Sequence, residues 1–308
     1  MRSTRRSRNS RTASSPSSPW PPRMPSLIDI RRRIRSVRNT QQITKAMKMV
    51  SAAKLRRAQD RVIASRPYGA ALRGLLADVA AAAGSDERVA AHPLLARRPI
   101  ERIQLVLITS DKGLAGAFNS NLIKAAQRFA AEHQPAKIDF ELIGRKGRDF
   151  FRKRSVEITG EHLGMAKVVY EEAAAIAQKL MERFSQPEID AVYLLYNEFK
   201  SVMAQKVTLI QVLPVELPEQ QEPTDFIFEQ PPLDMLTSLL PRYVESEVYR
   251  ALLESAAAEH AARMTAMDAA TSNASDMIDS LTLYMNRVRQ ASITKEIIEV
   301  VSGAAAAD

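Results

Sequence analysis

The stretch Leu27–Leu55, LIDIRRRIRSVRNTQQITKAMKMVSAAKL, decides the fold of this chain. Its apolar residues recur at steps of three and four, which is the spacing of one face of a helix. They are Leu27, Ile30, Ile34, Val37, Ile43, Met47 and Val50. No Gly or Pro interrupts the chain before Pro67, and Ser26 provides an N-cap. About forty residues rising ~1.5 Å each form a helix of roughly 60 Å, a length that indicates a coiled coil.

The same spacing returns near the other end of the chain, from about Leu233 to Val301, where Pro241 is the one proline and Gly303 is the predicted stop. Alanines dominate its middle, and larger apolar residues follow from Met277 onward. Since the distance between helix axes depends on the side chains at the contact, the alanine seam predicts a close approach of two backbones.

The charges of the two helical segments are opposite. Residues 27–66 hold twelve Lys and Arg against two acids, whereas residues 243–301 hold five Lys and Arg against nine acids. Opposite charge favours antiparallel pairing of the two segments, as flanking charges do in coiled coils. The alternative is that these are the solvated faces of two independent helices.

Between the two segments, apolar strand patterns alternate with helical ones. Strands are expected over 103–109, 138–143, 189–196 and 205–213, with a brief one near Val156 and helices over 119–132, 147–154 and 167–184. This order predicts βαβ units with a mostly parallel sheet.

The expected fold is α/β with long helices: an antiparallel coiled coil of the N- and C-terminal helices plus a Rossmann-like α/β central domain. Residues 1–23 are expected to be a disordered basic extension, because they hold six Arg and no acid. Residues 24–83 form the N-terminal coiled-coil helix, 84–232 the central domain with its connectors, and 233–308 the C-terminal coiled-coil helix.

Several kinds of chemistry have no support in the sequence. The chain has no cysteine, which excludes disulfides and thiolate sites. The loop SDKGLAG over 110–116 follows a strand, as phosphate loops do, but lacks the GxGxxG and GxxxxGK[ST] spacings. The four histidines lack metal-ligand spacing. The sequence therefore predicts no catalytic, cofactor-binding or metal residue.

Three separated motifs resemble the gamma chains of F-type ATP synthases of the bacterial type. They are the Leu27–Leu55 stretch, TSDKGLAGAFNSNL over 109–122, and a C-terminal set that includes PRYVESEVY over 241–249 and NRVRQASITKEIIEVVSGA over 286–304. The resemblance covers about residues 24–305.

The resemblance implies a central rotor shaft without a catalytic site of its own. Such a shaft couples rotation of the c-ring, driven by protons, to the cycling of the catalytic beta subunits during ATP synthesis. Its implied partners are the alpha, beta, epsilon and c-ring subunits, with no nucleic acid and with membrane contact only through the complex. The implied location is the cytoplasmic face of the bacterial inner membrane.

The resemblance also implies two sets of contact residues. Contacts with beta subunits are expected at Lys45, Met47, Lys48, Arg287, Arg289, Gln290 and Thr294. Contacts of the foot with the c-ring and epsilon subunits are expected at Tyr243, Glu245 and Tyr249. Met47 also lies on the apolar stripe, so packing inside the coiled coil is the alternative role for it.

Two other functions remain open on the sequence alone. The net charge of +9 fits a nucleic-acid-binding coiled coil, although the basic helix has no aromatic residue for base stacking. The α/β pattern fits a nucleotide-dependent enzyme built on the central domain.

Overall fold

The computed structural model describes residues 26–83, 87–164, 168–217 and 229–305. The structure divides into two units, one containing residues 26–39 and 276–305 and the other containing residues 40–275. The predicted extension over residues 1–23 lies outside the described residues.

Two long helices begin and end the described chain. Helix α1 covers Leu27–Ala83 and continues through Pro67, where the sequence predicted a break. The ion pairs Arg66–Glu254 and Arg73–Glu247 join α1 to the second long helix on both sides of this proline. These contacts favour a continuous helix at Pro67. The second helix, α6, covers Pro232–Ala305 and includes Pro241. The stop predicted at Gly303 is wrong, because the alanines that follow are the strongest helix formers.

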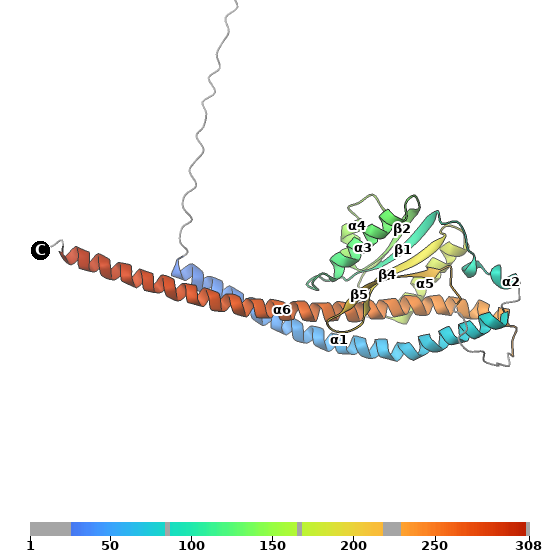
Figure 1. Ribbon diagram of the computed structural model, residues 1–308, viewed down its shortest axis with the longest axis horizontal. Helices are drawn as coiled ribbons and strands as arrows, with labels where there is room; N and C mark the ends of the chain where they lie inside the picture. Colours follow the sequence, from blue (N-terminus) through green and yellow to red (C-terminus); the bar gives the residue numbers. More distant parts are fainter. Residues whose placement is uncertain (1–25, 84–86, 165–167, 218–228, 306–308) are drawn as a thin grey trace, which may run out of the picture. The chain divides into compact units, whose positions relative to one another are not determined.

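Within residues 40–275, α1 and α6 pack side by side in opposite directions (Figure 1). The hydroxyls of Thr44 and Thr271 are 2.8 Å apart, and Lys48 donates to Asp268 one turn further along. Near the other end of the pair Arg73 contacts Glu247. Partner numbers fall along α6 as they rise along α1, which confirms the predicted antiparallel pairing and its opposite charges.

The inner face of α1 follows a regular alternation of three and four residues. Beyond residue 40 the buried positions of this pattern are Thr44, Ser51, Leu55, Val62, Leu72, Leu76, Val79 and Ala83, and Ala77 is buried beside them. The half-buried Gln41, Lys48, Ala58, Ser65 and Gly69 fill the remaining positions of the pattern. The predicted stripe through Ile43, Met47 and Val50 is therefore wrong in this segment, because the inner positions between residues 41 and 51 are polar.

The predicted close approach of the alanine seam is also wrong. Cα atoms of α1 and α6 seldom come within 8 Å of each other among the described residues. Instead, the alanine-rich part of α6 also packs against the central domain, where Ala257, Ala258 and Ala261 are fully buried. Small side chains are needed because this part of α6 has a neighbour on two sides.

The central domain has a five-stranded sheet with the order β3-β2-β1-β4-β5. Its strands are β1 (Arg102–Ile108), β2 (Lys137–Ile143), β3 (Glu157–His162), β4 (Ala191–Phe199) and β5 (Gln205–Leu213). The first four are mutually parallel, and β5 pairs antiparallel with β4. The predicted βαβ pattern and Rossmann-like sheet are confirmed.

Helices cover both faces of this sheet (Figure 1). Helices α3 (Phe118–Glu132) and α4 (Arg145–Phe151) follow β1 and β2, while α5 (Tyr170–Ser185) follows β3. Right-handed crossovers place α3 and α4 on one face and α5 on the other, since the chain reverses direction across the sheet after β3. The short helices α2 (Glu87–Ala90) and η1 (Pro93–Leu95) lie in the connector before β1.

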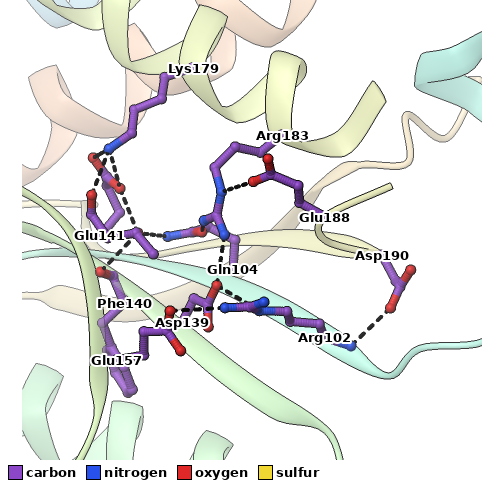
Figure 2. Close-up of polar contacts among 11 residues, drawn as sticks. Arg102, Gln104, Asp139, Phe140, Glu141, Glu157, Lys179, Arg183, Glu188 and Asp190 are labelled. Atoms are coloured by element: carbon purple, nitrogen blue, oxygen red, sulfur yellow. Dashed lines mark hydrogen bonds and ion pairs between the residues drawn. The ribbon is translucent and has the colours of Figure 1, made fainter. Parts of the chain in front are cut away.

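An ionic network joins α5 to the sheet (Figure 2). The carboxylate of Asp139 on β2 is 1 % exposed and accepts hydrogen bonds from Arg102 Nε at 2.9 Å and from Arg183 Nη2 at 2.8 Å. Arg183, on α5, also donates to Gln104 on β1 and to Glu188. The spacing of Asp139 and Glu141 places them on one face of β2, but the partners of these carboxylates depend on the register of the neighbouring strands and on the packing of α5, which the sequence does not give.

Glu141 is the other centre of the network and is fully buried. It accepts hydrogen bonds from Thr159 at 2.9 Å and from Lys179 at 3.1 Å, and its Oε1 lies 2.7 Å from His162 Nε2. Gly160 on β3 makes room for this carboxylate, since a Cβ built there would lie 1.9 Å from Glu141 Oε1. Burial on its own raises the pKa of Glu141, but these partners together hold it below its ordinary value.

Replacing Glu141 by glutamine should destabilise the protein by roughly 2–3 kcal/mol at pH 7, because the hydrogen bonds to a charged acceptor are lost. A lowered folded pKa means that the contribution of Glu141 is complete above its unfolded value of 4.5 and is lost as the pH falls through the folded value. We measure the free energy of unfolding in urea for the unmodified protein and for the Glu141→Gln variant. The difference between the two values should be smaller below pH 4.5 than at pH 7. An equal difference at both pH values would contradict this role.

The pair Thr44–Thr271 should show strong coupling in a double-mutant cycle. The single change Thr44→Val removes the contact between the two hydroxyls and should cost about 1 kcal/mol, although the Thr271 hydroxyl keeps its hydrogen bond to the Met267 carbonyl. Adding Thr271→Val should recover most of that loss, because two methyl groups then meet where two hydroxyls did. The urea midpoints of the unmodified protein, the two single variants and the double variant measure the coupling. If the losses of stability in the single variants add up in the double variant, the hydroxyls do not interact.

Candidate functional site

The outer side of α1 presents apolar residues at the level where its inner side is polar. Ile43, Met47 and Val50 are four and three residues apart and therefore share a face. Ile43 is 59 % exposed and Val50 is 57 % exposed, while Met47 is half-buried. This reversal of polarity indicates a surface that another protein covers, because a soluble chain gains nothing from exposing such residues together. We call Ile43, Met47 and Val50 the outer apolar face.

The predicted residues Lys45, Met47 and Lys48 do not form one cluster. Lys45 is exposed, but it is two positions from Met47, which places it on a different side of the helix. Lys48 points toward α6 and is bound to Asp268. Only Met47 belongs to the outer apolar face, and the sequence had assigned its neighbours Ile43 and Val50 to the core.

Some of the cations of α1 are paired with acids of α6. Arg66 lies 3.8 Å from the buried Glu254, and Arg73 lies 3.6 Å from the buried Glu247. This pairing removes part of the charge on which the nucleic-acid hypothesis relied.

The predicted residues near the C-terminus lie in the unit formed by residues 26–39 and 276–305. Arg287, Arg289, Gln290 and Thr294 are all exposed, and the Thr294 hydroxyl donates to the Gln290 carbonyl at 3.0 Å. One turn further along, α6 exposes an apolar end. Its open hollow is lined by Ile293, Glu296, Ile297, Val300 and Val301. These residues lie within the motif over 286–304, and their repeated β-branched side chains are the sequence signal for an apolar surface here.

The predicted foot residues are partly engaged within the chain itself. Glu245 accepts a hydrogen bond from the Tyr170 hydroxyl at 2.7 Å. Tyr249 packs against the ring of Tyr170 with centroids 5.5 Å apart, and its hydroxyl accepts from Arg61 at 3.2 Å. Tyr243 is half-buried, and burial raises its pKa above the ordinary value. These three side chains therefore serve the chain's own packing as well as any partner.

The loop over residues 110–116 is occupied by the chain's own groups. The carboxylate of Asp111 accepts the backbone N–H of Arg145 at the start of α4, at 3.0 Å, and the N–H of Gly164 at the same distance. Arg263 on α6 donates to the carbonyls of Lys112 and Gly113. The Asp111 carboxylate therefore binds the first N–H group of α4, and Arg263 fixes the loop to α6.

The histidines have separate, local roles. His92 Nδ1 caps η1, His133 stacks on Phe129, and His162 contacts Glu141. His260 is largely buried, and desolvation lowers its pKa to about 4. Among the described residues, no group of three or more His, Cys, Asp or Glu could hold a metal ion. No helix in the described part of the chain is long and apolar enough to cross a bilayer.

The chain is similar to known proteins in its sequence and in its structure. A family model described as ATP synthase matches residues 26–307. The ATP synthase gamma chain of Solibacter usitatus is 74% identical over 284 residues, which cover 92% of this chain and 99% of the relative. The gamma chain of an Anaeromyxobacter species is 53% identical over 287 residues, covering 91% of this chain and 99% of that one.

Two solved structures contain chains of similar fold. The central stalk and c-ring structure of the Tetrahymena thermophila mitochondrial ATP synthase contains a chain with 27% identity and a TM-score of 0.57, and the match covers 74% of this chain and 99% of that chain. A chain of the Euglena gracilis mitochondrial ATP synthase has a TM-score of 0.61 at 19% identity, with 91% and 94% covered, and this shows the fold alone. By its sequence, its three motifs and its pair of long helices around an α/β domain, the chain belongs to the gamma chains of the ATP synthase family.

Proposed function

We propose that this chain is the central rotor shaft of a proton-translocating F-type ATP synthase. The shaft couples rotation of the c-ring to the conformational cycle of the catalytic beta subunits, and ATP is made on those subunits. The proposal is supported by the 74% identity to an ATP synthase gamma chain and by the match to a chain of a central stalk.

The single observation that carries this function is the reversed polarity of α1 between residues 41 and 51. Polar groups such as Thr44 and Lys48 face α6, whereas Ile43 and Val50 face outward. An apolar outer face on a helix pair fits a shaft that is gripped from outside by a surrounding ring. Because the pair presents different residues on different sides, its rotation offers each surrounding subunit a changing surface.

We further propose that the chain is a non-catalytic subunit. Support comes from the loop over 110–116, where the Asp111 carboxylate takes the first N–H group of α4 and Arg263 binds the carbonyl of Lys112. Reaction chemistry would then belong to the partner subunits, and this chain would act through its shape and its asymmetric surface.

The contact residues follow from this assignment as proposals. Met47, together with Ile43 and Val50, would meet the beta subunits, as would Lys45 and the exposed group Arg287, Arg289, Gln290 and Thr294. Lys48 would act indirectly through its bond to Asp268. The exposed parts of Tyr243, Glu245 and Tyr249 would belong to the foot near the epsilon subunit and the c-ring. Through that foot the chain would lie at the cytoplasmic face of a bacterial inner membrane.

Reconstitution tests the proposed function directly. Alpha and beta subunits of the same bacterium, mixed with this chain, should form a complex whose ATP hydrolysis is several-fold faster than that of the two subunits without it. We expect this increase because the catalytic sites of the beta subunits work in turn only when the ring is complete and contains the shaft. If ATP hydrolysis is the same with and without the chain, the rotor assignment fails.

Val50→Glu should weaken the function without weakening the fold. Val50 is exposed in the chain, so the helix pair should keep its stability within about 0.5 kcal/mol. A charge on the outer apolar face should lower ATP hydrolysis of the reconstituted complex by roughly tenfold if about 1.4 kcal/mol of favourable contact is lost.

The matched control is Gln42→Glu, which adds the same charge at an exposed position of α1 that neighbours Ile43 in sequence and therefore faces another side of the helix. This variant should hydrolyse ATP at nearly the unmodified rate. Equal losses in both variants would mean that the outer apolar face has no special part in coupling.

A further inference from the structure

Arg61 joins three segments that are distant in the sequence. It lies on α1, and its Nη2 donates to the carbonyl of Val168, just before α5 begins. The same nitrogen donates to the hydroxyl of Tyr249 on α6 at 3.2 Å. One guanidinium group therefore binds both long helices and the central domain.

A second contact lies beside the first and reinforces it. The Tyr170 hydroxyl, in the first turn of α5, donates to Glu245 on α6 at 2.7 Å. The rings of Tyr170 and Tyr249 meet edge to face at 79°. Burial and the neighbouring Glu245 raise the pKa of Tyr170 to about 12, so its hydroxyl keeps the proton that it donates. We call Arg61, Val168, Tyr170, Glu245 and Tyr249 the three-way clamp.

Further polar contacts fix the central domain to α6. Glu254 accepts the backbone N–H of Phe199 at the end of β4, at 3.0 Å. Arg263 donates to the carbonyls of Lys112 and Gly113. These bonds fix the domain to α6 at other levels, whereas the bond from Arg61 fixes it to α1.

This difference has a mechanical consequence. The apolar contacts of α1 at Leu55, Val62 and Leu72 are non-directional, and its polar contacts with α6 are individually weak, so small sliding movements of α1 along α6 meet little directed resistance. At the middle of the pair those contacts are a hydroxyl pair at Thr44 and an ion pair at Lys48, of which the lysine side chain is 39 % exposed. A side chain that binds all three segments removes this freedom.

We propose that Arg61 is a positioning residue that makes the central domain and both long helices turn as one body. This inference rests on the proposed rotor function. In it, force that enters through the foot and the central domain reaches α1 directly through Arg61 and not only through α6. Loss of Arg61 should then loosen coupling while leaving hydrolysis of ATP on the beta subunits largely intact.

The test uses the complete complex in inverted membrane vesicles. ATP hydrolysis and ATP-driven proton pumping are measured for the unmodified chain and for Arg61→Gln, Arg61→Lys, Tyr249→Phe and Arg56→Gln. The ratio of pumping to hydrolysis should fall about threefold or more in Arg61→Gln, where both hydrogen bonds are lost. It should fall less in Arg61→Lys and Tyr249→Phe, which each keep part of the clamp.

Arg56→Gln is the matched control, since Arg56 is exposed on the same helix and its loss removes the same charge. The ratio for this variant should equal that of the unmodified complex. The proposal is overturned if Arg61→Gln pumps with an unchanged ratio. It is equally overturned if pumping and hydrolysis fall together because the complex no longer assembles.

Hydrogen exchange separates failure of this inference from failure of the rotor function. Amides over residues 168–176 should exchange faster in Arg61→Gln than in Arg56→Gln, because the start of α5 has lost its attachment to α1. If the unmodified chain does not support pumping at all, the rotor function fails, yet the exchange measurement still tests the clamp. Unchanged exchange over 168–176 shows that Arg61 does not hold this segment.

Discussion

The antiparallel packing of α1 against α6 within residues 40–275 is the constraint on which the rest of the structure depends. The two helices flank the central domain in the sequence, so their pairing brings the two ends of that domain together. The apolar levels at Leu55, Val62, Leu72 and Leu76 supply the buried area, and polar levels at Thr44 and Lys48 interrupt it. Polar positions in a coiled coil stabilise less but restrict the register to the one that pairs them.

This constraint explains the composition of α6. Its middle must pack against α1 on one side and against the central domain on the other, so small side chains predominate there. Ala257, Ala258 and Ala261 are fully buried for this reason, and Arg263 reaches past them to the loop over 110–116. The same crowding converts a loop in the phosphate position of a Rossmann-like sheet into a docking surface for a helix.

A second consequence concerns the charges inside the central domain. Asp139 and Glu141 are almost or fully buried, and their partners come from α5 and from neighbouring strands. Buried ion pairs contribute little net stability compared with apolar packing, but breaking one is costly. The network therefore acts against small displacements of α5 on the sheet. Since α5 begins at the three-way clamp, this resistance continues toward the two long helices.

The sequence by itself determined the two long helices, the order of strands and helices, the antiparallel pairing by charge, and the family. Each of these follows from periodicity, from composition or from contiguous motifs, which are local properties. The tertiary structure decided which face of each helix is buried. Ile43 and Val50 match an apolar stripe by spacing, yet they lie outside, because α6 offers Thr271 and Asp268 at that level and polar groups pair with polar groups.

Only the tertiary structure decided the roles of Arg61, Asp139 and Glu141. Their partners are 18 to 188 positions away in the chain, and no local pattern encodes such separations. Burial of a charged group becomes favourable only when its partners are fixed around it, so the sheet register and helix packing had to exist first. The physical reason is general: periodicity records what one segment can bury, whereas a polar contact depends on what the other segment presents at the same place.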